Sequence, residues 1–112
     1  MGSTSTTAVM LYTTLPNTQL AQHIAQDLVS KRLVACANIL PASTSIYQWK
    51  GMVESASEVT MLCKTTLHHT EAARARIRAL HPYETPCIVW WELAGGDAAF
   101  LQWVHDETAK NA

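Results

Sequence analysis

The chain has 112 residues, of which 48% are hydrophobic and only 15% charged, so it is long enough for one domain with its own core. Its net charge is −1 and its Lys and Arg residues are scattered, which argues against a nucleic-acid partner or an anionic membrane surface. Because roughly a quarter of a soluble domain is usually charged, the low charge and the four Trp residues predict apolar surface that is covered by self-association.

The cysteine residues and the N-terminal segment indicate where in the cell the protein is located. Cys36, Cys63 and Cys87 are odd in number and lack Cys-x-x-Cys spacing, which disfavours a disulfide framework or a closed zinc site and predicts a cytoplasmic protein. No window of about 18 apolar residues is present, so no membrane span is expected. Residues 1–7 lack the basic start and apolar stretch of a secretory signal. We expect a disordered leader there, followed by a single domain over residues 8–112.

The first elements are predicted to be a strand and an amphipathic helix. Ala8 to Leu15 is apolar and β-prone, and Pro16-Asn17 then turns the chain, with Asn17 or Thr18 as the helix N-cap. The helix runs to about Arg32. Its apolar residues form two adjacent rows spaced by four: Leu20, Ile24 and Leu28, and Ala21, Ala25 and Val29.

A long hairpin is predicted next. Leu33 to Trp49 is mostly strand with a break at Pro41, Lys50-Gly51 makes the turn, and Met52 to Thr66 returns. An arm of about 15 residues reaches ~50 Å at the rise of a strand, which is longer than so small a domain can cover. An uncovered edge invites aggregation, so the excess length predicts an oligomer joined through strands.

The last third predicts helix, strand and helix. Leu67 to Leu80 is a helix with Ala73 and Ile77 on its apolar face, and Cys87 to Leu93 is apolar on both faces, as a central strand would be. Asp97 caps a helix from Ala98 to about Glu107. That helix is expected to bury four residues: Phe100, Leu101, Trp103 and Val104. The order β-α-β-β-α-β plus a terminal helix predicts the α+β, ferredoxin-like arrangement, with helices on one face of a mainly antiparallel sheet.

The candidate site is the segment from His81 to Cys87, which holds an imidazole, a phenol, a carboxylate and a thiol within seven residues and is stiffened by two prolines. Imidazole and thiolate together favour copper or zinc over magnesium or calcium, so His81, Glu84 and Cys87 are candidate ligands. The alternative is a well-ordered connection in which His81 caps the preceding helix. No nucleophile elbow, Gly-rich phosphate loop or His-Glu-x-x-His spacing is present, so we expect no enzyme activity.

Several segments together resemble the CutA divalent-cation tolerance proteins, in the right order from about Ala8 to Asp106. The matching segments are AQDLV (residues 25–29), RLVACANI (32–39), SIYQWKG (45–51), EV (58–59), KTT (64–66), HPYETP (81–86) and FLQW (100–103). The resemblance implies a ferredoxin-like homotrimer whose hairpin strands pair across subunits. It also implies a role in tolerance to copper and other divalent cations and the binding of copper, with His81 as the matching candidate ligand. Because His81 is the one sure ligand, we expect copper to bind weakly, and we expect no required cofactor.

The chain departs from the family pattern at three positions. Cys87 stands where members often have Glu, Tyr12 where some have Cys, and Phe100 where the family has Tyr. Four further residues are candidates for a pocket or a subunit interface: Trp49, Lys64, Tyr83 and Trp103. The alternative function is a trimeric small-molecule sensor resembling the PII signalling proteins, by analogy of fold alone, and a scaffold valued for its stability is the third.

Overall fold

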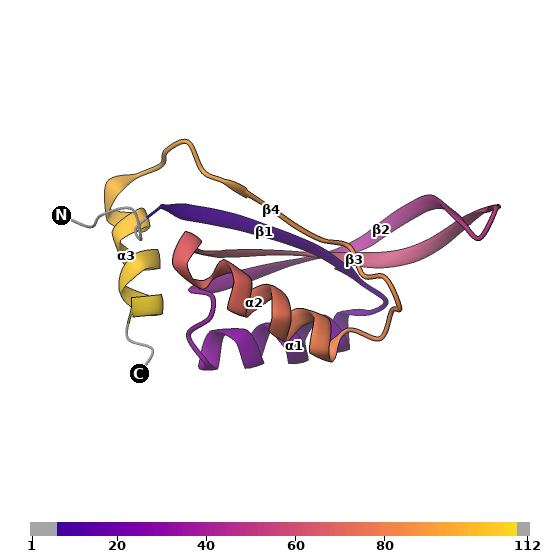
Figure 1. The fold of residues 1–112 in the computed structure, drawn as a ribbon, viewed down its shortest axis with the longest axis horizontal. Coiled ribbons are helices and arrows are strands. Elements are labelled where there is room, and N and C mark those ends of the chain that lie inside the picture. The colour runs from indigo at the N-terminus through magenta and orange to yellow at the C-terminus, as the bar shows by residue number, and fades with distance from the viewer. Residues whose placement is uncertain (1–6, 110–112) are drawn as a thin grey trace.

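The computed structural model describes residues 7–109, and its elements follow the predicted order (Figure 1). They are β1 (Ala8–Leu15), α1 (Thr18–Ser30), β2 (Cys36–Trp49), β3 (Met52–Thr66), α2 (Leu67–Leu80), β4 (Ile88–Glu92) and α3 (Ala98–Ala109). The four strands form one antiparallel sheet in the order β2-β3-β1-β4. Helices α1 and α2 lie along one face of this sheet, and α3 lies at one end of it (Figure 1). The predicted α+β, ferredoxin-like fold is confirmed.

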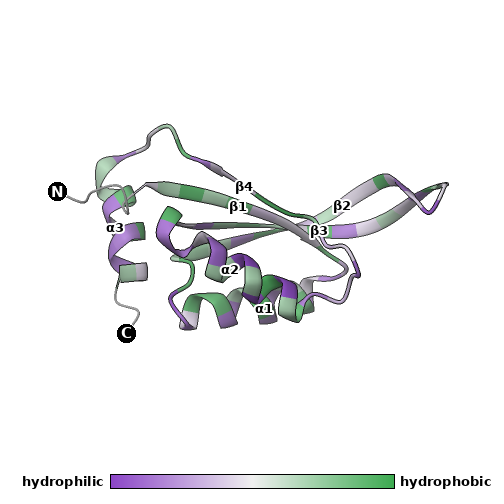
Figure 2. Cartoon of the chain, viewed as in Figure 1, coloured by the Kyte–Doolittle hydropathy of each residue, from purple (hydrophilic) through white to green (hydrophobic). Residues whose placement is uncertain are grey.

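The core lies between the sheet and the pair α1 and α2. Ile24 and Leu28 of α1 and Ile77 of α2 are fully buried, as their spacing on one helix face predicts. They pack with Leu11 and Met61 of the two central strands. Figure 2 shows that both helices carry hydrophobic and hydrophilic residues around their ribbons, which is the mark of a helix with one face on a core.

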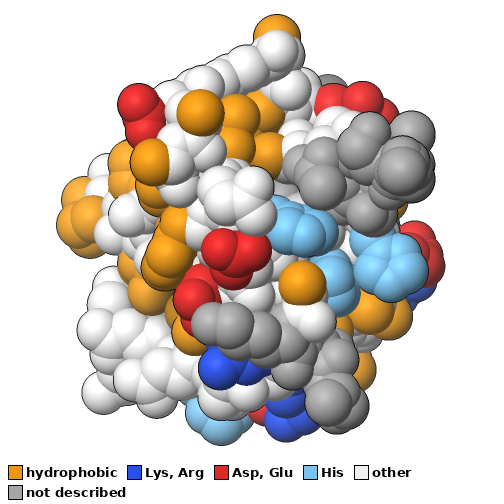
Figure 3. Space-filling model, turned by 90° about the vertical axis from the view of Figure 1, so that its left-hand side faces the viewer, with side chains coloured by type: hydrophobic (Ala, Val, Ile, Leu, Met, Phe, Trp, Pro, Cys, Tyr) orange, Lys and Arg blue, Asp and Glu red, His pale blue; other side chains and the backbone are white. Residues whose placement is uncertain are grey.

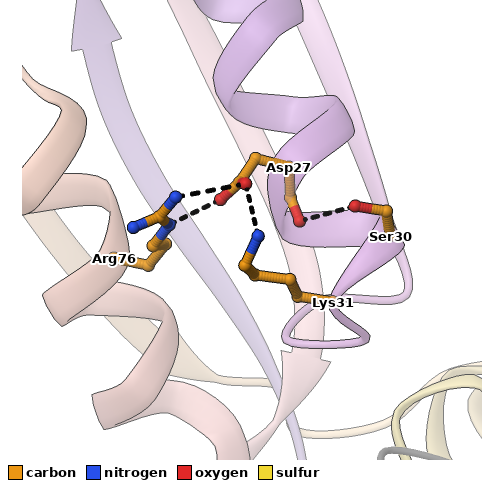
Figure 4. Close-up of polar contacts among 4 residues, drawn as sticks. All are labelled: Asp27, Ser30, Lys31 and Arg76. Carbon is orange, nitrogen blue, oxygen red and sulfur yellow. Dashed lines mark hydrogen bonds and ion pairs between the residues drawn. The ribbon is translucent and has the colours of Figure 1, made fainter.

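Polar contacts fix the ends of α1 and join it to α2. Asn17 is the N-cap, because its side-chain oxygen accepts a hydrogen bond from the backbone N–H of Leu20 at 2.8 Å. The Asp27 carboxylate forms ion pairs with Arg76, whose Nε lies 2.6 Å away, and with Lys31, whose Nζ lies 2.8 Å away (Figure 4). These cations, Arg76 first, hold the pKa of Asp27 well below its usual range. One carboxylate therefore ties the two helices together.

The hairpin of β2 and β3 projects beyond the two helices (Figure 1). Lys50 and Gly51 have φ angles of 49° and 82°, the left-handed conformations that a two-residue hairpin turn requires. The pairing register slips between Leu40 and Ser43, which flank the predicted break at Pro41. Long arms and the predicted turn are both confirmed.

Two expectations about burial were wrong. Among the described strands β4 pairs with β1 alone and so lies at the edge of the sheet, and its Trp90 and Trp91 remain 39% and 47% exposed. In α3 only Val104 of the four expected apolar residues is buried, while Phe100 and Trp103 are 40% and 42% exposed. A pattern of apolar residues predicts that they will be buried, but it does not say which surface buries them.

The end of the molecule at α3 shows a mixed surface. Figure 3 looks onto this end, where hydrophobic side chains reach the surface and histidines gather beside them. His68 and His69 contact each other with ring centroids 5.0 Å apart. Burial, and after it the neighbouring His68 and His105, lowers the pKa of His69.

The described ends of the chain add two facts. Of the predicted leader, residues 1–6 lie outside the described residues, while the Thr7 carbonyl accepts a hydrogen bond from the Leu67 backbone N–H at 2.8 Å. The last helix continues to Ala109, two residues beyond its predicted end. None of the helices within residues 7–109 is long and apolar enough to cross a membrane.

Candidate ligand cleft

A cleft of about 560 Å³ opens where the hairpin meets the segment that follows α2. Strand β2 contributes Ser45, Tyr47 and Trp49, which share one face because side chains alternate along a strand. Strand β3 contributes Glu54 and Glu58 by the same alternation. Strand β1 and the segment over residues 83–87 complete the wall. The cleft therefore gathers side chains from four separate parts of the chain.

Glu58 is the most enclosed acidic group of the cleft, with 8% of its surface exposed. Ser45 Oγ donates a hydrogen bond to its Oε1 at 2.5 Å, and the Tyr83 hydroxyl donates to its Oε2 at 2.8 Å. Burial and the nearby Glu58 carboxylate raise the pKa of Tyr83 to about 12. The phenol therefore stays protonated at neutral pH and keeps its donor role.

His81 is buried behind the cleft, and its ring nitrogens contact backbone atoms. Nε2 lies 2.8 Å from the carbonyl oxygen of Thr14, to which it donates, and Nδ1 accepts from the Tyr83 backbone N–H at 3.3 Å. This arrangement defines a neutral ring protonated on Nε2. The Tyr83 ring packs on it with centroids 4.7 Å apart. In this position His81 fastens the segment to β1.

Glu84 and Cys87 both line the cleft, so two of the three predicted metal ligands come together there. Burial, and then Glu58, raises the pKa of the Cys87 thiol. Within residues 7–109, no group of three or more His, Cys, Asp and Glu side chains is arranged to hold a metal ion. His81 could join Glu84 and Cys87 as a ligand only by giving up one of its two hydrogen bonds.

The other predicted residues divide between the cleft and the far end of the sheet. Trp49 and Tyr83 line the cleft. Lys64 instead donates to Asn38 Oδ1 at 2.5 Å, and its Nζ lies 5.9 Å from the centre of the Phe100 ring. Trp103 packs against the same Phe100 ring at 5.7 Å. The two departures from the family pattern at Tyr12 and Cys87 both fall on the cleft wall.

Sequence reasoning missed the acidic side of the cleft. Ser45, Glu54 and Glu58 were not among the candidates, although each lies on a strand that was predicted correctly. The available signal was the alternation in the two arms, which places Ser45, Tyr47 and Trp49 on one face of β2. The contact between Glu58 and Tyr83 joins residues that are 25 positions apart in the sequence, and no local pattern reveals it.

Comparison with known proteins gives a consistent result over nearly the whole chain. Residues 9–107 match the family described as CutA1 divalent ion tolerance protein. The chain is 43% identical over 95 residues to the divalent-cation tolerance protein CutA of Thermus thermophilus, covering 85% of this chain and 92% of that protein. CutA1 from Oryza sativa has a TM-score of 0.91 at 30% identity, with 96% and 99% of the two chains covered. The periplasmic divalent cation tolerance protein CutA from Archaeoglobus fulgidus has a TM-score of 0.87 at 37% identity, with 92% and 99% covered.

Proposed function

This chain belongs to the CutA1 family of divalent ion tolerance proteins, and we propose that it acts as a non-enzymatic homotrimer in copper tolerance. The observation that carries this proposal is the family match over residues 9–107, together with a fold shared at high TM-score with CutA1 structures. An assay for hydrolase, transferase and redox turnover should find no activity. Reproducible turnover that is lost in a Glu58→Gln or Cys87→Ser variant would contradict the proposal.

The trimer is supported by apolar surface at two strand edges. Ile46 and Val53 on the hairpin are 73% and 68% exposed, and Val89 on β4 is 50% exposed. A hairpin arm and an open edge strand are the features through which strands pair between subunits. Light scattering coupled to size exclusion should therefore give a mass of about three chains, whereas a monomer at micromolar concentration would contradict the assembly.

The copper site we propose is weak and lies where the cleft wall over residues 83–87 adjoins the buried His81. The Cys87 thiol and the Glu84 carboxylate would supply donor atoms from the cleft lining. The third donor would be the imidazole of His81, which contacts the backbone of Thr14 and Tyr83. Copper heads the affinity order of the common divalent metals for such donors. Recruiting His81 breaks one hydrogen bond, which costs about 1 kcal/mol and weakens the site. Because a raised thiol pKa must be overcome, binding should strengthen as the pH rises.

Calorimetric titration with Cu(II), Zn(II) and Mg(II) tests this site. Wild type should bind Cu(II) most strongly, Cys87→Ser and Glu84→Gln should each weaken that binding, and His81→Gln should weaken it further. The matched control is Cys36→Ser, since Cys36 is also a free thiol but lies outside the cleft. Equal Cu(II) binding by wild type and all three cleft variants would remove the site from residues 81–87.

We also propose a cytoplasmic location, supported by three free cysteines without a disulfide among them. Fractionation of native cells tests this. The protein should appear with the cytoplasmic markers, and recovery with periplasmic markers, the location in the description of the Archaeoglobus fulgidus relative, would contradict it.

A second candidate function is the binding of a small molecule, as in a sensor. The specific observation that favours it is the cleft itself, whose volume of about 560 Å³ lies in the range of small-molecule sites. A thermal-shift screen of small molecules on the metal-free protein tests this function. Stabilisation by no class of molecule would contradict it.

A further inference from the structure

The cleft combines carboxylates with aromatic rings. Three carboxylates line it, from Glu54, Glu58 and Glu84, beside the rings of Tyr47, Trp49 and Tyr83. Among the described residues that line it, none is Lys, Arg or His. The charge of this wall is therefore negative and is not balanced from within the cleft.

The acidic and aromatic groups are interleaved by the strand register. Tyr47 of β2 lies directly opposite Glu54 of β3. On the same faces of their strands, Trp49 lies nearer the hairpin turn than this pair, and Glu58 lies farther from the turn. A ligand lying along the hairpin would therefore meet a ring and a carboxylate side by side. An extended aromatic surface with adjacent negative charge is the environment that binds organic cations.

The Glu58 carboxylate is positioned by two hydrogen bonds and can still accept another from a positively charged group. Ser45 and Tyr83 each donate one hydrogen bond to its oxygens, which fixes the carboxylate and leaves further lone pairs for another donor. An ammonium N–H is such a donor, and a charge-assisted hydrogen bond to a buried carboxylate is among the stronger polar contacts.

The protein already places a cation over one ring of this wall. Lys50 Nζ lies 5.6 Å from the centre of the Trp49 ring, within the distance at which a cation is attracted to an aromatic face. Within residues 7–109, four other basic side chains are paired with carboxylates of the same chain. These pairs leave fewer cations on a second copy to fill the cleft, which favours a free ligand.

We propose that the cleft binds a small organic ammonium ion, with the ammonium group at Glu58 and the apolar body against the rings of Tyr47 and Trp49. This inference deepens the small-molecule function proposed above and is independent of copper binding. The copper ion proposed above uses the donor atoms of His81, Glu84 and Cys87, whereas an organic ammonium ion uses the Glu58 carboxylate and the aromatic rings.

The test is a calorimetric titration of the full chain in the presence of a chelator, with three probes of similar size. Benzylamine is positively charged at neutral pH, benzyl alcohol is neutral and benzoate is negative. Benzylamine should bind with a Kd in the millimolar range or below, and the other two should bind at least about tenfold more weakly. Equal binding of benzylamine and benzyl alcohol, or no binding of benzylamine, would overturn the proposal.

Variants locate the binding. Glu58→Gln keeps the shape of the side chain and should weaken benzylamine about tenfold, and Trp49→Leu should weaken it by a few-fold. The control Glu92→Gln removes the same charge from β4, outside the cleft, and should leave the Kd within about twofold. If Glu58→Gln does not fold, Glu54→Gln on the exposed hairpin carries the test and should also weaken benzylamine.

The results distinguish the binding of an organic ammonium ion from contact with a second copy of the chain and from copper binding. Benzylamine binding that is equal in wild type, Glu58→Gln and Glu54→Gln would overturn the assignment to the cleft. Failure of benzylamine together with an altered oligomeric mass in Glu58→Gln would overturn it in favour of a second copy of the chain. Copper titrated separately into the same variants reports on metal binding alone, so either proposal can fail while the other stands.

Discussion

The two ends of β3 have the same alternating pattern but lie in different surroundings. Toward its C-terminal end, Met61 and Cys63 are fully buried beneath α1 and α2, whereas Val53 near the hairpin turn is 68% exposed. Figure 1 shows the reason, since the helices cover one end of the sheet and stop short of the hairpin. Apolar residues of the covered end therefore stabilise the fold of the single chain, while those of the hairpin require a surface from outside it.

The cleft lies at the boundary between these two ends. Glu58 immediately precedes the buried Val59 and is itself 8% exposed, while Glu54 is exposed on the hairpin. The wall that contains Glu58 is therefore anchored to the folded core, whereas the wall that contains Glu54 belongs to the projecting hairpin. A ligand bound between them would sense the position of the hairpin, which is the part of the chain that we propose to pair with other subunits.

The largest effect is expected in the covered end. Leu28→Ala removes a fully buried side chain of α1 and should lower the free energy of unfolding by about 2–5 kcal/mol, because a cavity replaces its contacts. Denaturant unfolding measures this change. The control is Val29→Ala on the same helix, where the side chain is 40% exposed and a change of about 0.5 kcal/mol or less is expected. Similar losses in the free energy of unfolding in both variants would contradict the idea that the buried face of α1 stabilises the fold.

A smaller effect on folding and a larger one on assembly are expected at the hairpin. Val53→Asp places a charge on an apolar surface that we propose is buried between subunits, so size exclusion with light scattering should show a lower mass than wild type. The melting temperature should depend less on protein concentration than it does for wild type. Ala72→Asp, which puts the same charge on an exposed face of α2, should leave the mass unchanged. An unaltered mass in Val53→Asp would show that the hairpin is not an interface.

The covered end was also the part that the sequence predicted best. The rows in α1 and the face of α2 depend on spacing within one helix, and the core between them followed. β4 was placed at the centre of the sheet because Val89, Trp90 and Trp91 are apolar on both faces. Hydrophobicity reports how much surface is to be buried, but the strand order that leaves β4 at an edge is set by the whole fold.

The cleft was only half predicted for the same physical reason. Tyr83, Glu84 and Cys87 lie close together in one short segment stiffened by two prolines, so a local pattern indicated them. Glu58 reaches them only through the pairing of β3 with β1 and of β1 with β4. The imidazole of His81 was taken as a ligand because of its chemistry, whereas its hydrogen bond to the Thr14 carbonyl depends on a contact 67 residues away.

The next effect in size concerns the link between the two helices. Asp27→Asn removes the charge that Arg76 and Lys31 contact, and should lower the free energy of unfolding by about 1 kcal/mol or less, since these groups are partly exposed and screened. The pKa of Asp27 is lower in the folded than in the unfolded chain, so its contribution is present above about pH 4 and is lost as the pH falls further. Denaturant unfolding at pH 7 and pH 3 measures both effects.

A matched exposed pair provides the control for that prediction. Glu71→Gln breaks the contact between Glu71 and Arg74, which lie on one exposed turn of α2, and should change stability little at either pH. If Asp27→Asn were as stable as wild type at pH 7, the contact with Arg76 would not contribute to holding α1 and α2 together. If its deficit persisted unchanged at pH 3, the loss would not come from the charge.

The smallest expected effect concerns the ionisation of the Tyr83 hydroxyl, which lies in the cleft at the boundary between the two ends of β3. The pKa of Tyr83 is about 12, raised by burial and by Glu58, so the phenol favours its neutral form more in the folded chain than in the unfolded chain, where a tyrosine titrates near about 10. Its contribution to stability is therefore complete below about pH 10 and is lost as the pH rises toward 12. An ultraviolet titration should show a tyrosine of the folded protein ionising at about pH 12. Tyr83→Phe should remove that step, and Glu58→Gln should move it toward the ordinary value. A titration unchanged in Glu58→Gln would mean that burial alone raises the pKa, and that Glu58 does not hold the hydroxyl across the cleft.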